Sequence, residues 1–246
     1  MRLFFNIGQY FLLLKKVFSR PEKRWVYFRQ IIIEINNLGI NSLGIVIIIS
    51  LFMGAVITLQ TAYNIENPLI PLYVIGTGTR DSIILEFSSS MLGLILAGKI
   101  GSNIASEIGT MRVTEQIDAL EVMGVNSASY LIMPKIIAAM FINPFLTVIS
   151  IFLGIFGGWL ACVSTGVVPS QEYIYGIQFV FVPYFVVYSL IKVTIFAFII
   201  TSVSSYHGYY TKGGALEVGR ASTKGVVYSS VLILLFNLIL TQLFLA

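Results

Sequence analysis

The sequence predicts an all-α integral membrane protein, and three observations support this prediction. Hydrophobic residues make up 57% of the chain and charged residues only 11%, whereas about 25% of residues are charged in a typical soluble domain. Several apolar runs reach the ~20 residues that a helix needs to cross a bilayer. At 246 residues, the chain has no room for a second domain of ordinary size, so we expect residues 1–246 to form one membrane domain.

Residues 1–35 predict amphipathic helices that lie in the membrane interface and do not cross it. Large apolar side chains recur at the three- and four-residue spacing of one helix stripe, at Phe4, Ile7, Phe11, Leu14 and Phe18. Basic residues lie on or beside this stripe, namely Lys15, Lys16, Arg20, Lys23 and Arg24. This arrangement is typical of a helix among anionic headgroups. The alternative is a helix packed on a soluble core, and a chain this apolar offers little such core.

Five apolar runs are long enough for membrane-spanning helices. They cover Leu38–Tyr63, Ser82–Ile104, Pro134–Val163, Tyr173–Val203 and Val226–Leu245. Lysine and arginine concentrate before the first run and around the loops that follow the second and fourth, whereas the two other loops contain only Arg80. Because cytoplasmic segments carry the excess of basic residues, we expect a cytoplasmic N-terminus and, with an odd number of spans, a C-terminus on the outer side.

A polar island at residues 107–124 separates the second and third predicted spans. It holds four of the eleven acidic residues of the chain, which are Glu107, Glu115, Asp118 and Glu121. Thr114 is expected to cap a helix with acidic residues in its first turn, and Gly124 to end that helix in the left-handed conformation. One apolar ridge is expected along it, formed by Val113, Ile117, Leu120 and Met123. A helix this short is marginal in water, so the island predicts a docking element; an ordinary solvated loop helix is the alternative.

Charged side chains inside spans are functional candidates, because each costs about 2.5–3.5 kcal/mol at the centre of a bilayer. Glu86 lies near the outer end of the second span and Lys192 near the middle of the fourth. Lys192 is compatible with three surroundings: a polar cavity, a lipid phosphate, or an ion pair with Glu86. A snorkelling lysine or an internal salt bridge remains the alternative to a substrate contact.

Small residues at helical spacing predict close packing of helices, because they let two backbones approach each other in lipid. One seam crosses the end of the second span, at Gly98, Gly101, Ser102 and Ala105, and a second pair in the third span consists of Gly154 and Gly158. The spacing leaves open whether the contact lies within one chain or between two copies.

The sequence gives no support for nucleotide binding, metal binding or nucleic-acid binding by this chain. The run from Gly93 to Lys99 matches the spacing of a phosphate-binding loop, but it lies inside a span, and Ile100 stands where a hydroxyl would contact magnesium. His207 has no partners at metal-ligand spacing, and the basic residues do not form a groove with interleaved aromatics. We therefore expect no enzyme, no metal, no cofactor and no nucleic-acid partner for this chain.

The run from Glu107 to Gly124, preceded by Ala97-Gly-Lys-Ile-Gly-Ser102, closely resembles the MlaE-type (YrbE-like) permeases. These are the membrane subunits of ABC lipid transporters that work with MCE-domain proteins. Leu59-Gln60, Leu190-Ile-Lys192 and Val218-Gly-Arg-Ala-Ser-Thr223 support the resemblance, which runs along nearly the whole chain. One segment departs from the pattern: the family usually has Arg-Glu-Leu-Gly-Pro where this chain has Leu85-Glu-Phe-Ser-Ser89.

The resemblance implies a homodimeric, multi-pass permease in the bacterial inner membrane, with a periplasmic C-terminus. It implies a cytoplasmic ABC ATPase that binds ATP and magnesium, a periplasmic MCE-domain partner, and phospholipid as the molecule moved between membrane and partner. The coupling helix would use Glu107, Thr114, Glu115, Ile117, Asp118, Leu120, Glu121 and Met123. The lipid pocket or intramembrane polar site would use Gln60, Glu86 and Lys192. The rival hypothesis is an ATP-independent scaffold or channel whose cytoplasmic helix docks another soluble protein.

Overall fold

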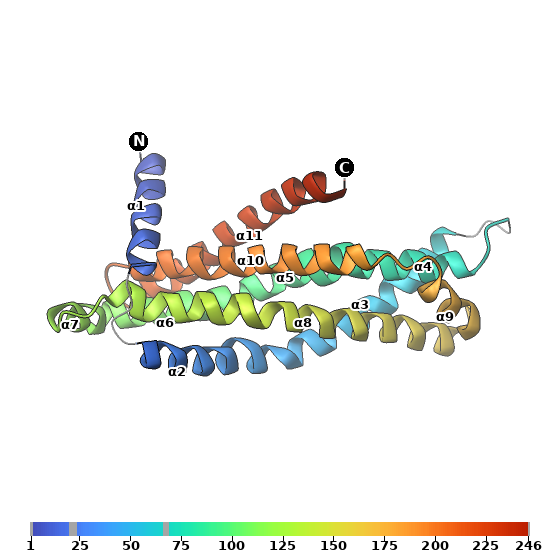
Figure 1. The fold of residues 1–246 in the computed structure, drawn as a ribbon, viewed down its shortest axis with the longest axis horizontal. Coiled ribbons are helices and arrows are strands. Elements are labelled where there is room, and N and C mark those ends of the chain that lie inside the picture. The colour runs from blue at the N-terminus through green and yellow to red at the C-terminus, as the bar shows by residue number, and fades with distance from the viewer. Residues whose placement is uncertain (1, 20–23, 66–68, 246) are drawn as a thin grey trace. The chain divides into compact units, whose positions relative to one another are not determined.

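The computed structural model describes residues 2–19, 24–65 and 69–245, and every element within these ranges is a helix, which confirms the predicted all-α class (Figure 1). The α-helices are α1 (Arg2–Val17), α2 (Arg24–Ile35), α3 (Asn41–Asn64), α4 (Tyr73–Ser82), α5 (Leu92–Leu96), α6 (Ser102–Val113), α7 (Gln116–Val122), α8 (Ser127–Thr165), α9 (Ser170–Gln178), α10 (Pro183–Tyr209) and α11 (Ala215–Leu245). Three π-helical segments join neighbouring helices: η1 (Asn36–Ile40), η2 (Ile83–Met91) and η3 (Ala97–Gly101).

Five helical stretches are long and apolar enough to cross a membrane, as the sequence predicted. They are Tyr27–Asn64, Tyr73–Val113, Ser127–Thr165, Pro183–Tyr209 and Ala215–Leu245. Four of the five predicted runs lie entirely within these stretches. The protein is therefore a multi-pass membrane protein by the length and composition of its helices.

The fourth predicted span, Tyr173–Val203, begins too early. Residues 170–178 form the separate helix α9, Val180 has a left-handed φ of 44°, and α10 begins only at Pro183. The Arg80 guanidinium donates hydrogen bonds of 2.8 Å to the carbonyl oxygens of Ile177 and Phe179, which satisfies acceptors that a helix end leaves open. Proline suits the first turn of a helix because it lacks an N–H. Hydropathy does not detect the Arg80 hydrogen bonds or the helix start at Pro183. The prediction from hydropathy therefore joined α9 and α10 into one span.

The N-terminal prediction concerns α1 and α2, which are both helical where the structure describes them. Along α1, Leu13 and Val17 are buried while Phe4 and Phe11 are exposed, so the helix is amphipathic in its packing. Placement of α1 in the membrane interface stays a prediction. Arg20 and Lys23 of the predicted basic cluster lie outside the described residues.

Two compact units make up the chain, and each is described by itself. The first comprises Met1–Asn41, Gly93–Asn143 and Thr194–Ala246. In it, α11 packs against α6, and small residues bring helices together: a Cβ atom added to Gly208 would lie 2.8 Å from the carbonyl oxygen of Ala105. Such a distance leaves no space for a larger side chain.

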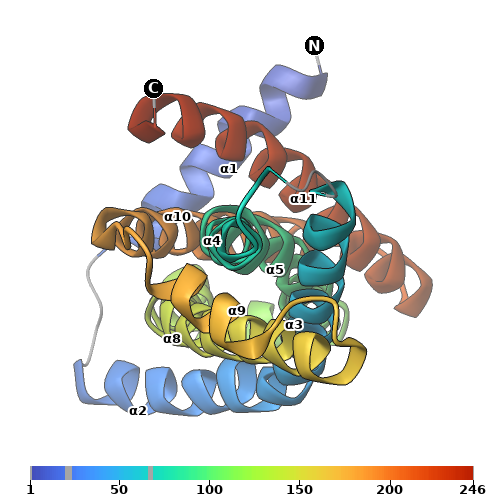
Figure 2. The same ribbon diagram turned by 90° about the vertical axis from the view of Figure 1, so that its right-hand side faces the viewer.

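The second unit comprises Ser42–Leu92 and Pro144–Val193. Its helices α3 and α8 approach backbone to backbone, because a Cβ on Gly54 would lie 1.9 Å from the carbonyl oxygen of Gly154. Helices α4 and α9 lie side by side in the same way (Figure 2). A Cβ on Gly176 would lie 2.0 Å from the carbonyl oxygen of Tyr73. Glycine residues therefore allow close backbone contact at both of these helix pairs.

Candidate functional site

The polar island 107–124 is not one helix but two, joined by a tight turn (Figure 1). Helix α6 ends at Val113, and α7 follows after Thr114 and Glu115. Glu115 has a left-handed φ of 60°, which is uncommon for a residue with a side chain. This turn redirects the chain and sets α7 apart from the long helical stretch before it.

Thr114 does not cap α7, contrary to the prediction. Its hydroxyl donates a hydrogen bond of 2.8 Å to the carbonyl oxygen of Thr110, one turn back in α6. Threonine can satisfy either a following N–H or a preceding carbonyl, and here α6 continues far enough to offer the carbonyl. Gly124 does end α7 as predicted, with φ 80°. The Val125 N–H then donates to the Leu120 carbonyl oxygen at 3.0 Å, as expected beyond a left-handed helix stop.

The predicted apolar ridge of the island is divided between the core and the surface. Ile117 is completely buried, and Leu120 and Val113 are partly buried, whereas Met123 is 68% exposed. Val122, which the sequence reasoning missed, is 89% exposed. The apolar surface offered by α7 is thus the pair Val122 and Met123 at its end, which we call the α7 tip. Helical periodicity could not identify Val122, because Val122 does not lie on the helix face that contains Ile117.

The rest of α7 is fastened to its own unit by polar contacts. Arg112 donates to Asp118 at 2.6 Å. The Glu121 carboxylate accepts hydrogen bonds from the Ser127 hydroxyl at 2.9 Å and the Tyr209 hydroxyl at 3.0 Å. The Ser127 bond, helped by Tyr209 and by the nearby charges of Lys16 and Arg112, holds the pKa of Glu121 below its ordinary value against the effect of partial burial. These bonds connect α7 to the first residue of α8 and the last residue of α10.

Glu107, which is 46% exposed, is part of an ion cluster around a buried lysine that the sequence reasoning did not find. Lys135 of α8 is buried, and its Nζ donates to Glu34 Oε1 at 2.7 Å and to Glu107 Oε2 at 2.8 Å. Glu34 on α2 is also buried. A signal was present, because Glu34 and Lys135 each stand alone among apolar residues, where a charge is retained only with a partner. Through this cluster, α6 is tied to α2 and α8.

Lys192 and Glu86 form an ion pair in the second unit, which is one of the surroundings considered for Lys192. The Lys192 side chain is fully buried, and its Nζ donates to Glu86 Oε1 at 3.2 Å and to the Leu85 carbonyl oxygen at 3.1 Å. It also lies 5.0 Å from the centre of the Tyr188 ring, within reach of a cation–π contact. Glu86 remains 52% exposed, and Gln60, on α3, is exposed as well.

The segment that departs from the family pattern, Leu85–Ser89, lies entirely within the π-helical segment η2. In this chain the segment continues as a helix without a break. Single π segments inside α-helices are frequent at functional sites. Here η2 presents the Leu85 carbonyl to two donors, Lys192 at 3.1 Å and the Ser89 hydroxyl at 2.7 Å.

The small-residue positions differ in how tightly they are packed. A Cβ on Gly101 would lie 2.8 Å from Ser204 Oγ, and one on Gly158 would lie 2.2 Å from the Tyr173 hydroxyl oxygen. Ala105 is fully buried, and the Ser102 carbonyl accepts a hydrogen bond from Ser222 at 3.2 Å. A Cβ on Gly98, in contrast, would meet no atom of the described chain within 4 Å. Gly98 is therefore not needed for helix packing within one described chain.

Comparison with known proteins gives matches along both units. The model of the family described as Permease MlaE matches residues 31–243. A probable ABC transporter permease protein of Rickettsia bellii is 36% identical over 249 residues, which cover 99% of this chain and 94% of the relative. The intermembrane phospholipid transport system permease protein MlaE of Haemophilus influenzae is 30% identical over 234 residues, covering 95% and 89%. The chloroplastic protein TRIGALACTOSYLDIACYLGLYCEROL 1 of Arabidopsis thaliana is 31% identical over 241 residues, covering 93% and 65%.

Proposed function

We propose, from the premise that this chain belongs to the MlaE permease family, that it is the membrane permease of an ABC transporter that moves phospholipid. Family membership confirms the resemblance seen in the sequence. The relative from Haemophilus influenzae is named for intermembrane phospholipid transport, and the one from Rickettsia bellii for ABC transport. The five apolar helical stretches supply the membrane part of such a transporter. ATP hydrolysis would take place on a separate subunit that binds ATP and magnesium.

The observation that carries the coupling part of the proposal is the α7 tip. Val122 and Met123 are exposed at the end of a helix whose other side is held by buried Ile117 and by the bonds of Asp118 and Glu121. An apolar pair on a fixed helix suits insertion into a groove of a partner. We propose that a cytoplasmic ABC ATPase receives the α7 tip, with the N-terminus of this chain on the same side of the membrane.

The contacts of Glu121 provide a route by which movement of α7 reaches the membrane helices. Its carboxylate joins α7 to Ser127 at the start of α8 and to Tyr209 at the end of α10. When the ATPases close, displacement of α7 would pull on both helices at once. The Glu107–Lys135 contact would carry the same displacement from α6 to α8.

The full assembly proposed is a homodimer in the bacterial inner membrane, with a periplasmic MCE-domain protein that exchanges phospholipid with it. Within the membrane, we assign Lys192 a positioning role. It is fully buried and holds Glu86 by an ion pair, so it fixes the half-exposed carboxylate of Glu86 and does not itself reach a headgroup. Replacing Lys192 by alanine would then change lipid loading through Glu86, which would lose this ion pair.

A charge placed on the α7 tip tests the coupling proposal. We expect Val122→Asp with Met123→Asp to reduce co-purification of a co-expressed ABC ATPase by about tenfold or more, because a central apolar anchor of an interface typically contributes over 1 kcal/mol. Phospholipid transfer between vesicles should fall with it. Gln116→Glu is the matched control, since it adds a negative charge to exposed α7 surface away from the tip.

Unchanged retention of the ATPase by the double variant would reject the docking role of the α7 tip. Thermal unfolding of both variants in detergent shows whether the fold is intact. If the wild-type chain itself retains no ATPase, the ATP-independent scaffold or channel becomes the better hypothesis.

A further inference from the structure

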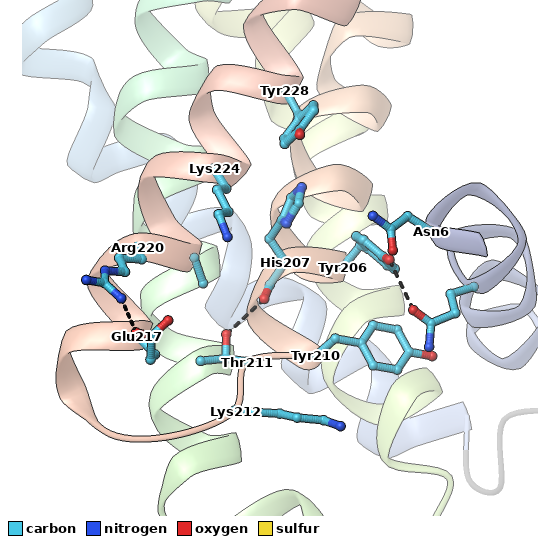
Figure 3. A pocket seen from close by; sticks show the side chains of 12 residues that line it. Asn6, Tyr206, His207, Tyr210, Thr211, Lys212, Glu217, Arg220, Lys224 and Tyr228 are labelled. Carbon is cyan, nitrogen blue, oxygen red and sulfur yellow. Dashed lines mark hydrogen bonds and ion pairs between the residues drawn. The ribbon is translucent and has the colours of Figure 1, made fainter. Parts of the chain in front are cut away.

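A cavity of about 410 Å³ lies in the first unit, away from the α7 tip (Figure 3). Its walls come from α1, from the end of α10, from the loop after α10 and from the first turns of α11. Its volume falls in the range of roughly 300–1,000 Å³ that is usual for small-molecule sites. The lining includes three cationic side chains, Lys212, Arg220 and Lys224, and one acidic side chain, Glu217.

The charges of this cavity do not cancel. Arg220 is paired with Glu217, with 2.5 Å between Nη1 and Oε1. Among the described residues, neither Lys212 nor Lys224 forms an ion pair. Figure 3 shows Lys224 extending from α11 toward His207 and Thr211. Two uncompensated ammonium groups around one cavity favour an anion there, and a phosphate is the anion that lysine commonly binds as a point charge.

An apolar cavity of about 390 Å³ adjoins this polar one. The two share the side chains of Asn6, Tyr206, His207 and Tyr228. Ile7, Val203 and Leu232 complete the apolar walls. The shared wall is ordered by ring contacts, since His207 stacks on Tyr228 with centroids 5.1 Å apart and planes at 14°. The pair of cavities therefore offers a cationic chamber on one side of this wall and an apolar chamber on the other.

Helix α1 is held in place as the outer wall of the apolar chamber. Tyr10 and Ser202 hydroxyls lie 2.8 Å apart in a hydrogen bond, and the Tyr10 and Tyr206 rings meet edge to face at 5.8 Å. The Tyr206 hydroxyl also donates to Gln9 Oε1 at 3.4 Å. These contacts fix the opening between α1 and α10.

We propose that the two cavities form one binding site for an anionic phospholipid. The phosphate would lie in the cationic chamber that Lys212 and Lys224 line, and an acyl chain would occupy the apolar chamber beside Ile7, Val203 and Leu232. A free phosphate compound satisfies only the cationic chamber, whereas a lipid satisfies both. Two of the helices that line the site, α10 and α11, are long and apolar enough to cross a membrane, which would bring the site next to membrane lipids. The inference does not depend on the coupling role of the α7 tip.

Lipid retention tests the proposal directly. The full chain is reconstituted in vesicles of equal parts phosphatidylglycerol and phosphatidylcholine, extracted in mild detergent, and analysed by native mass spectrometry. We expect phosphatidylglycerol to be retained in preference, and Lys212→Gln with Lys224→Gln to lower its retention by about tenfold or more, the scale expected from two cation contacts to an anionic lipid. The control is Arg29→Gln, which removes an exposed charge of the same unit outside the cavity. It should retain the lipid as the wild type does.

Further arms separate a lipid from a soluble phosphate. Ile7→Ser should lower phosphatidylglycerol retention, and excess glycerol 3-phosphate should fail to displace the lipid. Lys212→Arg with Lys224→Arg should retain it, which guards against loss through misfolding. The proposal is overturned if both lipids are retained equally, if the Lys→Gln variant behaves as the wild type, or if glycerol 3-phosphate displaces the lipid while Ile7→Ser has no effect.

Discussion

Two buried lysines, one in each compact unit, are held by different sets of oxygen atoms. Lys135 in the first unit meets two carboxylates, Glu34 and Glu107, at 2.7 and 2.8 Å. Lys192 in the second unit is even less exposed, yet it meets one carboxylate, the half-exposed Glu86, and the carbonyl oxygen of Leu85. The units also differ in packing, since the second depends more on glycine contacts such as Gly54 against Gly154.

This difference in partners predicts that the loss of Lys135 costs more stability than the loss of Lys192. When Lys135 is lost, Glu34 is left as a charge inside the protein, and such a charge is costly to keep. When Lys192 is lost, Glu86 is not left as a buried charge, because its side chain is 52% exposed. We infer that the Lys135 cluster stabilises the first unit, whereas the Lys192 pair positions a group that stays accessible. Four predictions test this comparison, from the largest expected effect to the smallest.

Lys135→Met should lower the free energy of unfolding by about 3–5 kcal/mol, the cost of breaking a buried pair from one side. Both Lys135 and Glu34 are almost completely enclosed, so water cannot replace the lost partner. Chemical denaturation in detergent micelles measures the change. Adding Glu34→Gln to the variant should recover part of the loss; no recovery would mean that the charge of Glu34 is not the cause.

Gly54→Ala should destabilise the second unit by about 1–3 kcal/mol through overpacking. The new methyl group would lie 1.9 Å from the backbone of Gly154, so α3 and α8 must separate. Gly98→Ala is the control, because a Cβ there meets nothing within 4 Å, and alanine in a helix is favoured over glycine by roughly 0.5–1 kcal/mol. Thermal unfolding should shift in opposite directions for the two variants. A shift of the same sign would contradict the difference in packing.

Lys192→Met should change the free energy of unfolding by only about 1 kcal/mol, the net value of a hydrogen bond. The reason is that Glu86 stays accessible after the change. The same denaturation measurement applies, with Lys135→Met as the reference. If both variants lose the same free energy of unfolding, the proposed difference between Lys135 and Lys192 is wrong.

The smallest expected effect is a pH dependence from Glu121. Its pKa in the folded chain is lower than the ordinary value of 4.5, so its stabilising contribution is complete above that value and is lost as pH falls through the lower, folded value. Between pH 6 and about pH 3, the wild type should therefore lose stability relative to Glu121→Gln, which cannot titrate at this position. Thermal unfolding at stepped pH measures the difference. Parallel curves for the two proteins would show that the Ser127 and Tyr209 bonds do not stabilise the ionised form.

Sequence patterns predicted much of the fold but less of the site. Four spans and the polar island were placed correctly, because long apolar runs and clustered charges are local properties of a chain. The fourth span was placed too early, because the bonds of Arg80 to Ile177 and Phe179 join residues far apart in the sequence. The same limit hid the partnership of Glu34, Glu107 and Lys135.

The sequence by itself determined the all-α class, the number of spans, the helix stop at Gly124 and membership of the permease family. These follow from composition, periodicity and the long motif at residues 107–124, which can be recognised without knowing the tertiary contacts. Only the tertiary structure decided that Ile117 turns inward while Val122 and Met123 face outward, that Lys192 pairs with Glu86, and that Lys212 and Lys224 line one cavity. The physical reason is that burial and charge pairing depend on neighbours that come from other helices.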